Sequence, residues 1–278
     1  MPRFAGCQCN TVTLGHNRAM ELTIAAWQTS SIPGDPDANL RRLAETARQA
    51  SAAGADVLVT PEMFLTGYNI GASAIAELAQ RDLTGEVADI ARQAEIAIVA
   101  GLPVVADGQV YNACVFVAES GEVRAVHHKV HLFGDLDRAV FAAGSVPCTL
   151  VEHRGAQLAM MICYDVEFPE YVRSAAVAGA EVLLVPTANM QPFDIVPRTI
   201  LPARAWENQL AIAYANHVGA DGDLLYTGLS GIFGPDGEAL MMAGRSESLL
   251  IATVDTAQVQ ADRKANPYLE DRRPDVYR

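Results

Sequence analysis

Short apolar runs alternate with segments of helical periodicity along most of the chain. After an apolar run at 22–27, leucines and alanines between residues 40 and 50 recur at the spacing of one helix face. The next run, Asp56-Val-Leu-Val-Thr-Pro-Glu62, predicts a short buried strand with Glu62 at its carboxyl end. A helix is expected at 86–95, and further strands at 96–100, 110–117 and 123–130. This alternation is typical of an α/β fold.

The second half of the chain repeats this plan. Strands are expected at 157–162, 181–186, 210–216, 229–233 and 249–254, and helices at about 168–179 and 198–209. The segment Gly54-Ala-Asp-Val-Leu-Val-Thr-Pro61 closely matches Gly179-Ala-Glu-Val-Leu-Leu-Val-Pro186 in residue type. We therefore predict two α/β halves related by pseudo-symmetry within one domain at 20–261.

Both ends of the chain differ from this pattern. Residues 1–19 lack periodicity and precede a second methionine, Met20, so they are interpreted as a leader or a disordered extension. The tail at 262–278 is charged, contains Pro267 and Pro274, and has no apolar face of its own. Such a tail is either disordered or docked on another subunit.

The composition favours a soluble globular protein. The formal net charge of −13 opposes nucleic acid and anionic membranes as partners, because both require a basic face. No apolar run approaches the ~20 residues of a membrane span, and the N-terminus lacks the apolar segment of a signal peptide. Five cysteines in a chain of 278 residues do not resemble a disulfide framework. We expect a cytoplasmic protein.

Cys163 lies where a strand gives way to a helix. The apolar run 158–162 precedes it, and Pro169-Glu170 suits the first turn of the following helix. A helix N-terminus favours thiolate over thiol, and its free backbone N–H groups can donate to a developing oxyanion. The alternative is a buried structural cysteine, which is the commoner case for a cysteine in an apolar strand.

Glu62 and Lys129 each follow or lie within an apolar segment. At these positions the predicted strands would expose both side chains at one end of a sheet. Each residue alone could be a solvated side chain. With Cys163, however, they supply the three groups that acyl transfer needs: a base for the thiol proton, a cation for the oxyanion and a nucleophile.

Three motifs resemble the nitrilase-like carbon–nitrogen hydrolases. They are Thr60-Pro-Glu-Met-Phe-Leu-Thr-Gly-Tyr68, His128-Lys-Val-His-Leu-Phe-Gly134 and Ile162-Cys-Tyr-Asp-Val-Glu-Phe-Pro-Glu170, in family order and at family-like spacing. The resemblance extends from about Met20 to the C-terminus. It implies a four-layer αββα sandwich of two halves, and a homodimer or higher homo-oligomer in which the tail at 262–278 docks at a subunit interface.

The resemblance also implies roles for individual residues. Glu62 would be the general base and Cys163 the nucleophile that forms a thioester acyl-enzyme. Lys129 and the backbone N–H of Tyr164 would stabilise the tetrahedral intermediate, without any metal or organic cofactor. Many family members carry a second glutamate eight residues after the lysine. Asp137 stands there in this chain with a side chain one methylene shorter, and Asp135 is an alternative.

Other kinds of active site have little support in the sequence. His127 and His128 would face opposite sides of a strand and lack a carboxylate cluster, which opposes a metal site. His131 is expected to shape the site through hydrogen bonds. Ser230 lacks the final glycine of a nucleophile elbow, and no phosphate-binding loop is present.

The residue four positions after the nucleophile bears on the substrate. Relatives that cleave carbamoyl amino acids or dicarboxylic monoamides often have an arginine there, whereas this chain has Glu167. A carboxylate would repel an acid and accept an ammonium or neutral group. Alternatively, Glu167 only caps the helix that follows.

We therefore expect an amidase for small amides whose far end is neutral or bears an amine. The sequence Tyr164-Asp165 is typical of amidase branches, and residues 133–138 and 266–274 resemble stereoselective amidases. The alternatives are an N-carbamoyl amine hydrolase, a nitrilase, or a regulatory protein without turnover. The predicted pocket walls are Phe64, Tyr68, Phe133, Asn189 and Met190. For the aromatic residues among them, packing in the core is the alternative.

Overall fold

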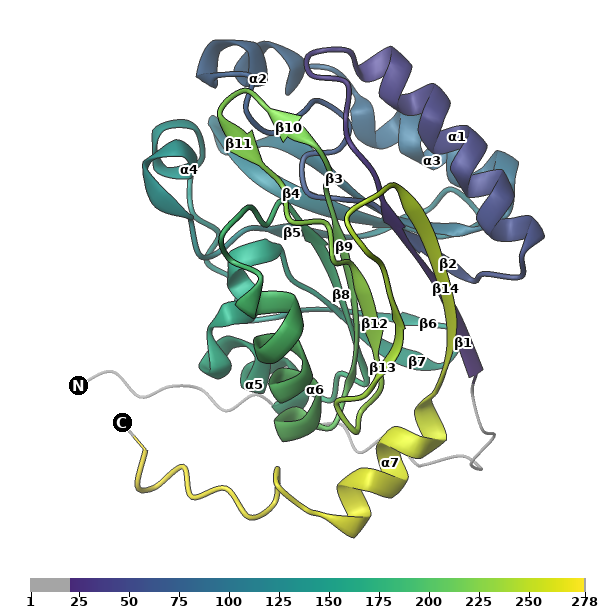
Figure 1. The fold of residues 1–278 in the computed structure, drawn as a ribbon, viewed down its shortest axis with the longest axis vertical. Helices are drawn as coiled ribbons and strands as arrows, with labels where there is room; N and C mark the ends of the chain where they lie inside the picture. Colours follow the sequence, from purple (N-terminus) through teal and green to yellow (C-terminus); the bar gives the residue numbers. More distant parts are fainter. Residues whose placement is uncertain (1–20, 278) are drawn as a thin grey trace.

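The computed structural model describes residues 21–277, so the predicted leader at 1–19 lies outside the described residues. Two six-stranded sheets form the centre of the molecule (Figure 1). The first sheet has the order β14-β1-β2-β3-β4-β5, and the second has the order β13-β12-β9-β8-β7-β6. A two-stranded ribbon, β10 (Ala220–Asp221) and β11 (Leu224–Leu225), stands apart from both sheets.

The strands of the two sheets come largely from different halves of the chain. The first sheet contains β1 (Glu21–Gln28), β2 (Val57–Val59), β3 (Ala97–Ala106), β4 (Gln109–Val117), β5 (Val123–His128) and β14 (Ser248–Asp255). The second contains β6 (Thr149–His153), β7 (Ala156–Met160), β8 (Val182–Thr187), β9 (Ala211–Asn216), β12 (Gly231–Phe233) and β13 (Ala239–Met242). Among the strands within residues 21–277, β14 alone comes from the second half and joins the first sheet, where it pairs with β1.

Each sheet has a parallel centre and antiparallel edges. Strands β1, β2 and β3 are parallel to one another, as are β7, β8 and β9. The carboxyl ends of parallel strands share one edge of a sheet. The segments that follow β2 and β7, which carry Glu62 and Cys163, therefore leave their sheets at corresponding positions.

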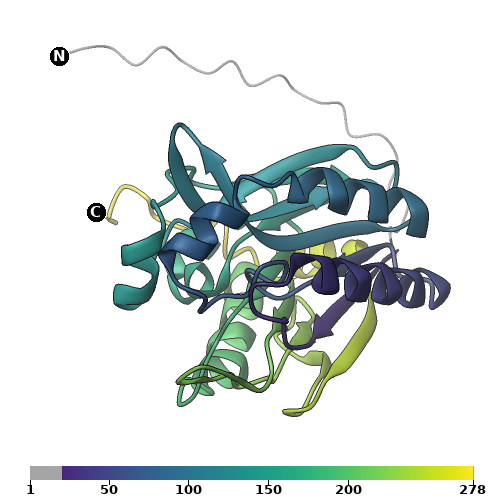
Figure 2. The same cartoon turned by 90° about the horizontal axis from the view of Figure 1, so that it is seen from above.

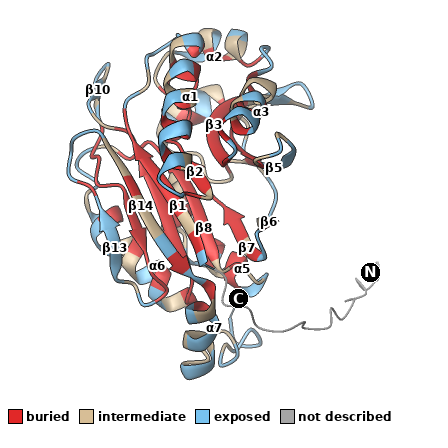
Figure 3. Cartoon of the chain, turned by 90° about the vertical axis from the view of Figure 1, so that its right-hand side faces the viewer, coloured by how far each residue is buried: buried red, intermediate tan, exposed pale blue. Residues whose placement is uncertain are grey.

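Helices cover the outer face of each sheet. Helices α1 (Pro36–Ala52) and α3 (Leu83–Ala94) run side by side over the first sheet (Figure 2), and α5 (Pro169–Val177) and α6 (Leu201–Asn208) cover the second. Between the sheets lies a core of small and branched residues such as Val57, Val99 and Leu184. The central strands β2, β8 and β9 are accordingly buried along their whole length, whereas the edge strand β13 is exposed (Figure 3). The predicted four-layer αββα sandwich is confirmed.

Several element ends differ from the prediction. The strand predicted at 123–130 ends at His128, so Lys129 leaves the sheet. The helix predicted at 198–209 begins as a turn of π-helix, η2 (Val196–Ile200), and continues as α6. Two short helices, α2 (Ala72–Leu78) and α4 (Gly134–Val140), lie in segments between strands.

Helix α7 (Thr256–Ala265) is not predicted by the hydrophobic pattern, because only Thr256 and Val259 of its residues are buried. It begins at Asp255, whose side chain accepts a hydrogen bond from the N–H of Ala257. The tail expected from residue 262 therefore starts inside a helix.

The first residues of that tail are held by their own chain. Gln209 Nε2 donates to the carbonyls of Asp262 at 2.8 Å and Asn266 at 2.6 Å, and Arg263 donates to the carbonyl of Ala180. Beyond this point the tail passes α6, where Tyr268 contacts Trp206 edge to face (Figure 1). Docking of the remaining residues at a subunit interface stays a prediction.

One close backbone approach fixes the segment that follows β2. A Cβ atom on Gly101 of β3 would lie 2.4 Å from the carbonyl oxygen of Pro61, 2.6 Å from the nitrogen of Met63 and 2.8 Å from Cα of Glu62. These are backbone atoms, which cannot rotate away. Only glycine therefore allows Glu62 to sit against β3.

We predict that Gly101→Ala lowers the free energy of unfolding by about 1–3 kcal/mol, because the added methyl overpacks this contact. Gly244→Ala is the matched control, since its Cβ would meet no atom within 4 Å. Urea unfolding monitored by circular dichroism measures both. Equal midpoints for the two variants would contradict the prediction.

Candidate active site

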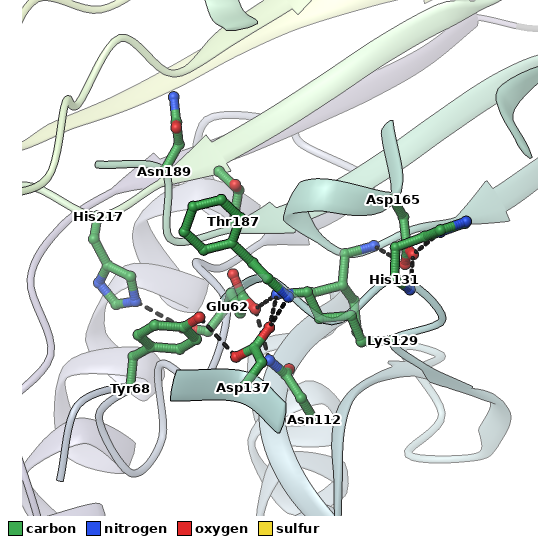
Figure 4. Close-up of polar contacts among 12 residues, drawn as sticks. Glu62, Tyr68, Asn112, Lys129, His131, Asp137, Asp165, Thr187, Asn189 and His217 are labelled. Carbon is green, nitrogen blue, oxygen red and sulfur yellow. Dashed lines mark hydrogen bonds and ion pairs between the residues drawn. The ribbon is translucent and has the colours of Figure 1, made fainter. Parts of the chain in front are cut away.

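Glu62 and Lys129 meet in the interior, where both side chains are fully buried (Figure 4). The ammonium Nζ of Lys129 lies 2.6 Å from Oε1 of Glu62. It also lies 2.7 Å from Oδ2 of Asp137, which stands in α4. The structure thus brings three of the predicted residues into one ion cluster.

Asp137 reaches the lysine despite its short side chain. Besides the ammonium, it accepts hydrogen bonds from the Tyr68 hydroxyl at 2.7 Å and from the N–H of Phe133 at 2.9 Å. Asp135, the alternative, has a solvent-exposed side chain whose ion pair is with Arg138. Asp137 is therefore the carboxylate that contacts Lys129.

The ion cluster contains two carboxylates and one ammonium, so one negative charge is in excess when all three ionise. Burial alone would lower the pKa of Lys129, but the Glu62 and Asp137 carboxylates outweigh it and raise that pKa well above its usual range. Burial raises the pKa of Glu62, and Asp137 adds to this effect while Lys129 opposes it. Lys129 thus stays an ammonium, and Glu62 is the group that can accept a proton.

The two oxygens of Glu62 have different surroundings. Oε1 accepts from Lys129 and, at 2.6 Å, from Nδ2 of Asn112 on β4. Oε2 is buried and has no hydrogen-bond partner among the described residues. Since buried polar atoms are normally paired, Oε2 is available to a substrate, a water or a thiol. Asn112 was missed at the sequence level, although a lone amide within an apolar strand was its signal.

The second half of the chain holds the backbone of Glu62. Its N–H donates to the carbonyl of Thr187 at 3.2 Å, and its carbonyl accepts from Nε2 of His217 at 2.7 Å. Burial lowers the pKa of His217 to about 4, so this imidazole is neutral at pH 7. Neither residue was predicted, because nothing in the sequence shows that the ends of β8 and β9 lie beside Glu62.

Cys163 is the first residue of a short 3₁₀-helix, η1 (Cys163–Glu167), that follows β7. Its φ of 47° lies in the left-handed region, which costs a non-glycine residue about 1–2 kcal/mol. The N–H of Tyr164 stands in the first turn, where backbone N–H groups have no partner within the helix. The turn therefore places a sulfur and free backbone donors together.

The surroundings of Cys163 oppose the thiolate that its helix terminus was expected to favour. Burial raises the pKa of Cys163 far above its usual range, and the charge of Glu62 raises it further. Lys129 and hydrogen bonds from Thr187 and Ala188 oppose this shift without overcoming it. With only five residues, η1 offers little dipole against the loss of solvation, so the surroundings favour the thiol over the thiolate.

Asp165 links the nucleophile turn to the lysine segment. Its Oδ1 accepts from both the N–H and Nδ1 of His131 at 2.8 Å, and its Oδ2 accepts from the N–H of Ile162 at 3.1 Å and Nε2 of His127 at 3.3 Å. Burial alone would raise the pKa of Asp165, but the bonds from the two histidines outweigh it and lower the pKa to about 2. The carboxylate thus binds residues two positions either side of Lys129 and the residue before Cys163.

The predicted site histidines do not converge on a metal position. His127 and His131 contact Asp165, whereas His128 stacks on Tyr111 with ring centroids 4.1 Å apart. Within residues 21–277, no group of three or more His, Cys, Asp or Glu side chains has a metal-binding arrangement. His131 is thus connected to the turn at Cys163 through Asp165.

A cavity of about 170 Å³ opens onto the nucleophile. It is lined by Tyr68, Phe133, Cys163, Tyr164, Glu167, Ala188, Asn189, Met190 and Phe193. Phe64, expected as a wall, is instead buried in the core under α1, 4.8 Å from the ring of Trp27. The amide of Asn189 donates to the carbonyl of Phe193, so this side chain mainly supports the wall.

Glu167 faces the cavity and does not cap the following helix. Helix α5 has no side-chain cap hydrogen bond, which excludes the capping alternative. Arg204 donates to the backbone carbonyl of Glu167 at 2.7 Å and pairs with the carboxylate of Glu207. Burial raises the pKa of Glu167 to about 6.

Comparisons with known proteins agree with this site. The carbon–nitrogen hydrolase family model matches residues 23–264. A Pseudomonas protegens protein described as "Hydrolase in pqqF 5'region" is 45% identical, covering 92% of this chain and 90% of its own. An (R)-stereoselective amidase from Pseudomonas sp. is 37% identical, covering 88% and 89%.

Solved structures of an amidase from Nesterenkonia sp. AN1 have the same fold. One superposes with a TM-score of 0.83 at 38% identity and covers 92% of this chain and 98% of its own. A second, with a TM-score of 0.82 at 36% identity and coverage of 95% and 98%, carries the acetamide moiety of fluoroacetamide on its active-site cysteine. The chain therefore belongs to the carbon–nitrogen hydrolase family, in the amidase branch of the nitrilase superfamily.

Proposed function

We propose that this amidase hydrolyses small amides whose far end is neutral or bears an amine, with Cys163 as nucleophile and Glu62 as base. The observation that carries the proposal is the buried, unpartnered Oε2 of Glu62 within a cluster that already holds an ammonium. The charge of Glu62 raises the pKa of the Cys163 thiol and that of Lys129 lowers it, so the three groups are close enough to influence one another.

In the first step the Cys163 sulfur attacks the amide carbonyl carbon while its proton passes to Oε2 of Glu62. The new oxyanion is stabilised by the Lys129 ammonium and the N–H of Tyr164. Glu62 then returns the proton to the nitrogen, the C–N bond breaks, and ammonia leaves a thioester on Cys163.

In the second step Glu62 takes a proton from water, and the resulting hydroxide adds to the thioester carbonyl. Collapse of this intermediate breaks the C–S bond, and Glu62 returns its proton to the sulfur as the acid departs. The net reaction is amide plus water to carboxylic acid plus ammonia. Lys129 keeps its proton throughout, because the two carboxylates hold it as an ammonium.

Exposed apolar side chains support the proposed homo-oligomer. Trp206 on α6 is 51% exposed, and Val276 and Tyr277 near the C-terminus are 61% and 57% exposed. An interface including the tail would cover these groups. No helix within residues 21–277 is long and apolar enough to cross a membrane, and the cytoplasmic location stays a prediction.

The reaction is tested by measuring ammonia released from a panel of neutral amides, N-carbamoyl amines and nitriles. We expect the amides to be hydrolysed fastest, and intact-mass spectrometry to find an acyl adduct on the wild-type protein. Cys163→Ala should remain folded, lose turnover and carry no adduct. Faster carbamoyl or nitrile turnover would favour the alternative reactions, and activity in Cys163→Ala would contradict the nucleophile assignment.

Asp165 is predicted to position the catalytic groups without touching the substrate. Asn at this position has one acceptor oxygen, so its NH₂ group must face donors at His131 or at Ile162. We expect Asp165→Asn to lower kcat by about 10²-fold with a smaller change in KM, since small misplacements of catalytic groups have effects of this size. Steady-state kinetics on the folded variant provide the measurement.

The matched control is Asp56→Asn, which also removes a structural carboxylate. Asp56 accepts from the N–H of Thr23 at 2.8 Å and pairs with Arg154 at 3.0 Å, away from the site. It should lose stability without losing kcat. A wild-type kcat in Asp165→Asn would show that the four hydrogen bonds have no catalytic role.

A further inference from the structure

Aromatic rings form much of the wall of the cavity that Cys163 lines. Phe133 lies 5.2 Å from the ring of Tyr164 and 5.8 Å from that of Phe193, at interplanar angles of 77° and 82°. Tyr68 lines the same cavity. Rings standing nearly perpendicular to one another bound the cavity from several directions. Such walls suit an apolar group, and their electron-rich faces also attract a cation.

The Glu167 carboxylate has no ion-pair or hydrogen-bond partner in the part of the chain that the structure describes. The two nearby cations are already engaged: Lys129 by Glu62 and Asp137, and Arg204 by Glu207 and two backbone carbonyls. A carboxylate that is partly removed from water and unpaired is stabilised by a cation brought in by a ligand.

We propose that the site selects amides whose far end is an alkylated ammonium group, held between Glu167 and the aromatic rings of Phe133, Tyr164 and Phe193. This inference rests on the proposed amidase function and names its substrate class more narrowly. Cationic substrate groups among aromatic rings are a recurrent form of quaternary ammonium recognition.

The spacing of Cys163 and Glu167 limits the length of such a substrate. They are the first and last residues of η1, and a 3₁₀-helix rises ~2 Å per residue, so their Cα atoms are separated by roughly 8 Å. The sulfur and the carboxylate each occupy part of that span. This short separation favours a substrate with a short spacer between the amide carbonyl and the ammonium nitrogen.

The protonation of Glu167 adds a pH signature. Burial raises its pKa to about 6, so the carboxylate is ionised at pH 8 and largely protonated at pH 5. A preference for the cation should therefore be full at pH 8 and decline as the pH falls through 6. A preference based on shape alone would not change in this range.

The test compares three amides of similar size but different charge: trimethylammonioacetamide, its neutral isostere 3,3-dimethylbutanamide, and the anion malonamate. We expect kcat/KM at pH 8 to be about tenfold higher for the cation than for the isostere, as cation–π and ion-pair contacts imply. Malonamate should be the slowest substrate, because Glu167 repels it.

Two glutamates three residues apart provide variant and control. Glu167→Gln removes the charge in the cavity, whereas Glu170→Gln removes an exposed charge on α5 that does not line it. We expect Glu167→Gln to abolish the preference for the cation, so that kcat/KM for the cation falls to about that of the neutral isostere in the same variant. Glu170→Gln should keep the preference. Phe193→Leu removes one of the aromatic rings and should reduce the preference for the cation severalfold. Because Phe193 is partly exposed, the protein should tolerate this replacement.

The outcomes separate this inference from the function on which it rests. Turnover of the neutral isostere as fast as the cation, or equal effects of Glu167→Gln and Glu170→Gln, would overturn the ammonium selectivity and leave the amidase proposal intact. If none of the three compounds and no simple aliphatic amide is hydrolysed, the amidase proposal itself fails, and the selectivity with it.

Discussion

A buried cluster with one uncompensated negative charge determines the rest of the site. Placing Glu62, Lys129 and Asp137 out of water is costly, and removing one partner of such a pair typically costs about 3–5 kcal/mol. The cost is tolerable here because the ammonium is shared by two carboxylates and because Asn112, Tyr68 and backbone groups donate to them. The charge that remains makes Glu62 a base and disfavours a second anion on Cys163.

The geometry of that cluster depends on contacts between the two halves of the chain. Glu62 comes from the first half, but Thr187 and His217 of the second half hold its backbone. Conversely, Cys163 comes from the second half, and Asp165 ties it to the segment of Lys129 in the first. The core between the sheets keeps both sets of contacts in register. The site is thus a property of the folded sandwich, which neither half could form alone.

Local patterns were sufficient to predict two α/β halves and the strand ends that carry Glu62 and Cys163, whereas the four layers were predicted from the family resemblance. Parallel strands deliver their carboxyl ends to one edge, so the repeat of apolar runs already indicated where chemistry would gather. Failures arose where a residue's surroundings come from distant segments. Phe64 was expected in the pocket but packs under α1, the desolvation of the Cys163 thiol was not foreseen, and Asp165 gave no sign of its four donors. Helix α7 was missed because it buries only two side chains.

The central claim is that Cys163 rests as a thiol and loses its proton to Glu62 only when substrate is present. Thiolates absorb near 240 nm. The difference in this absorbance between the wild type and Cys163→Ala, followed across the pH range, measures the claim directly, because the contributions of the other cysteines cancel. The account predicts no difference signal between about pH 6 and 8, because burial and the nearby carboxylate hold the pKa of Cys163 well above that of a free thiol. A thiolate signal already present at pH 7 would contradict it, and would show that Lys129 and the turn at η1 ionise the sulfur before substrate arrives.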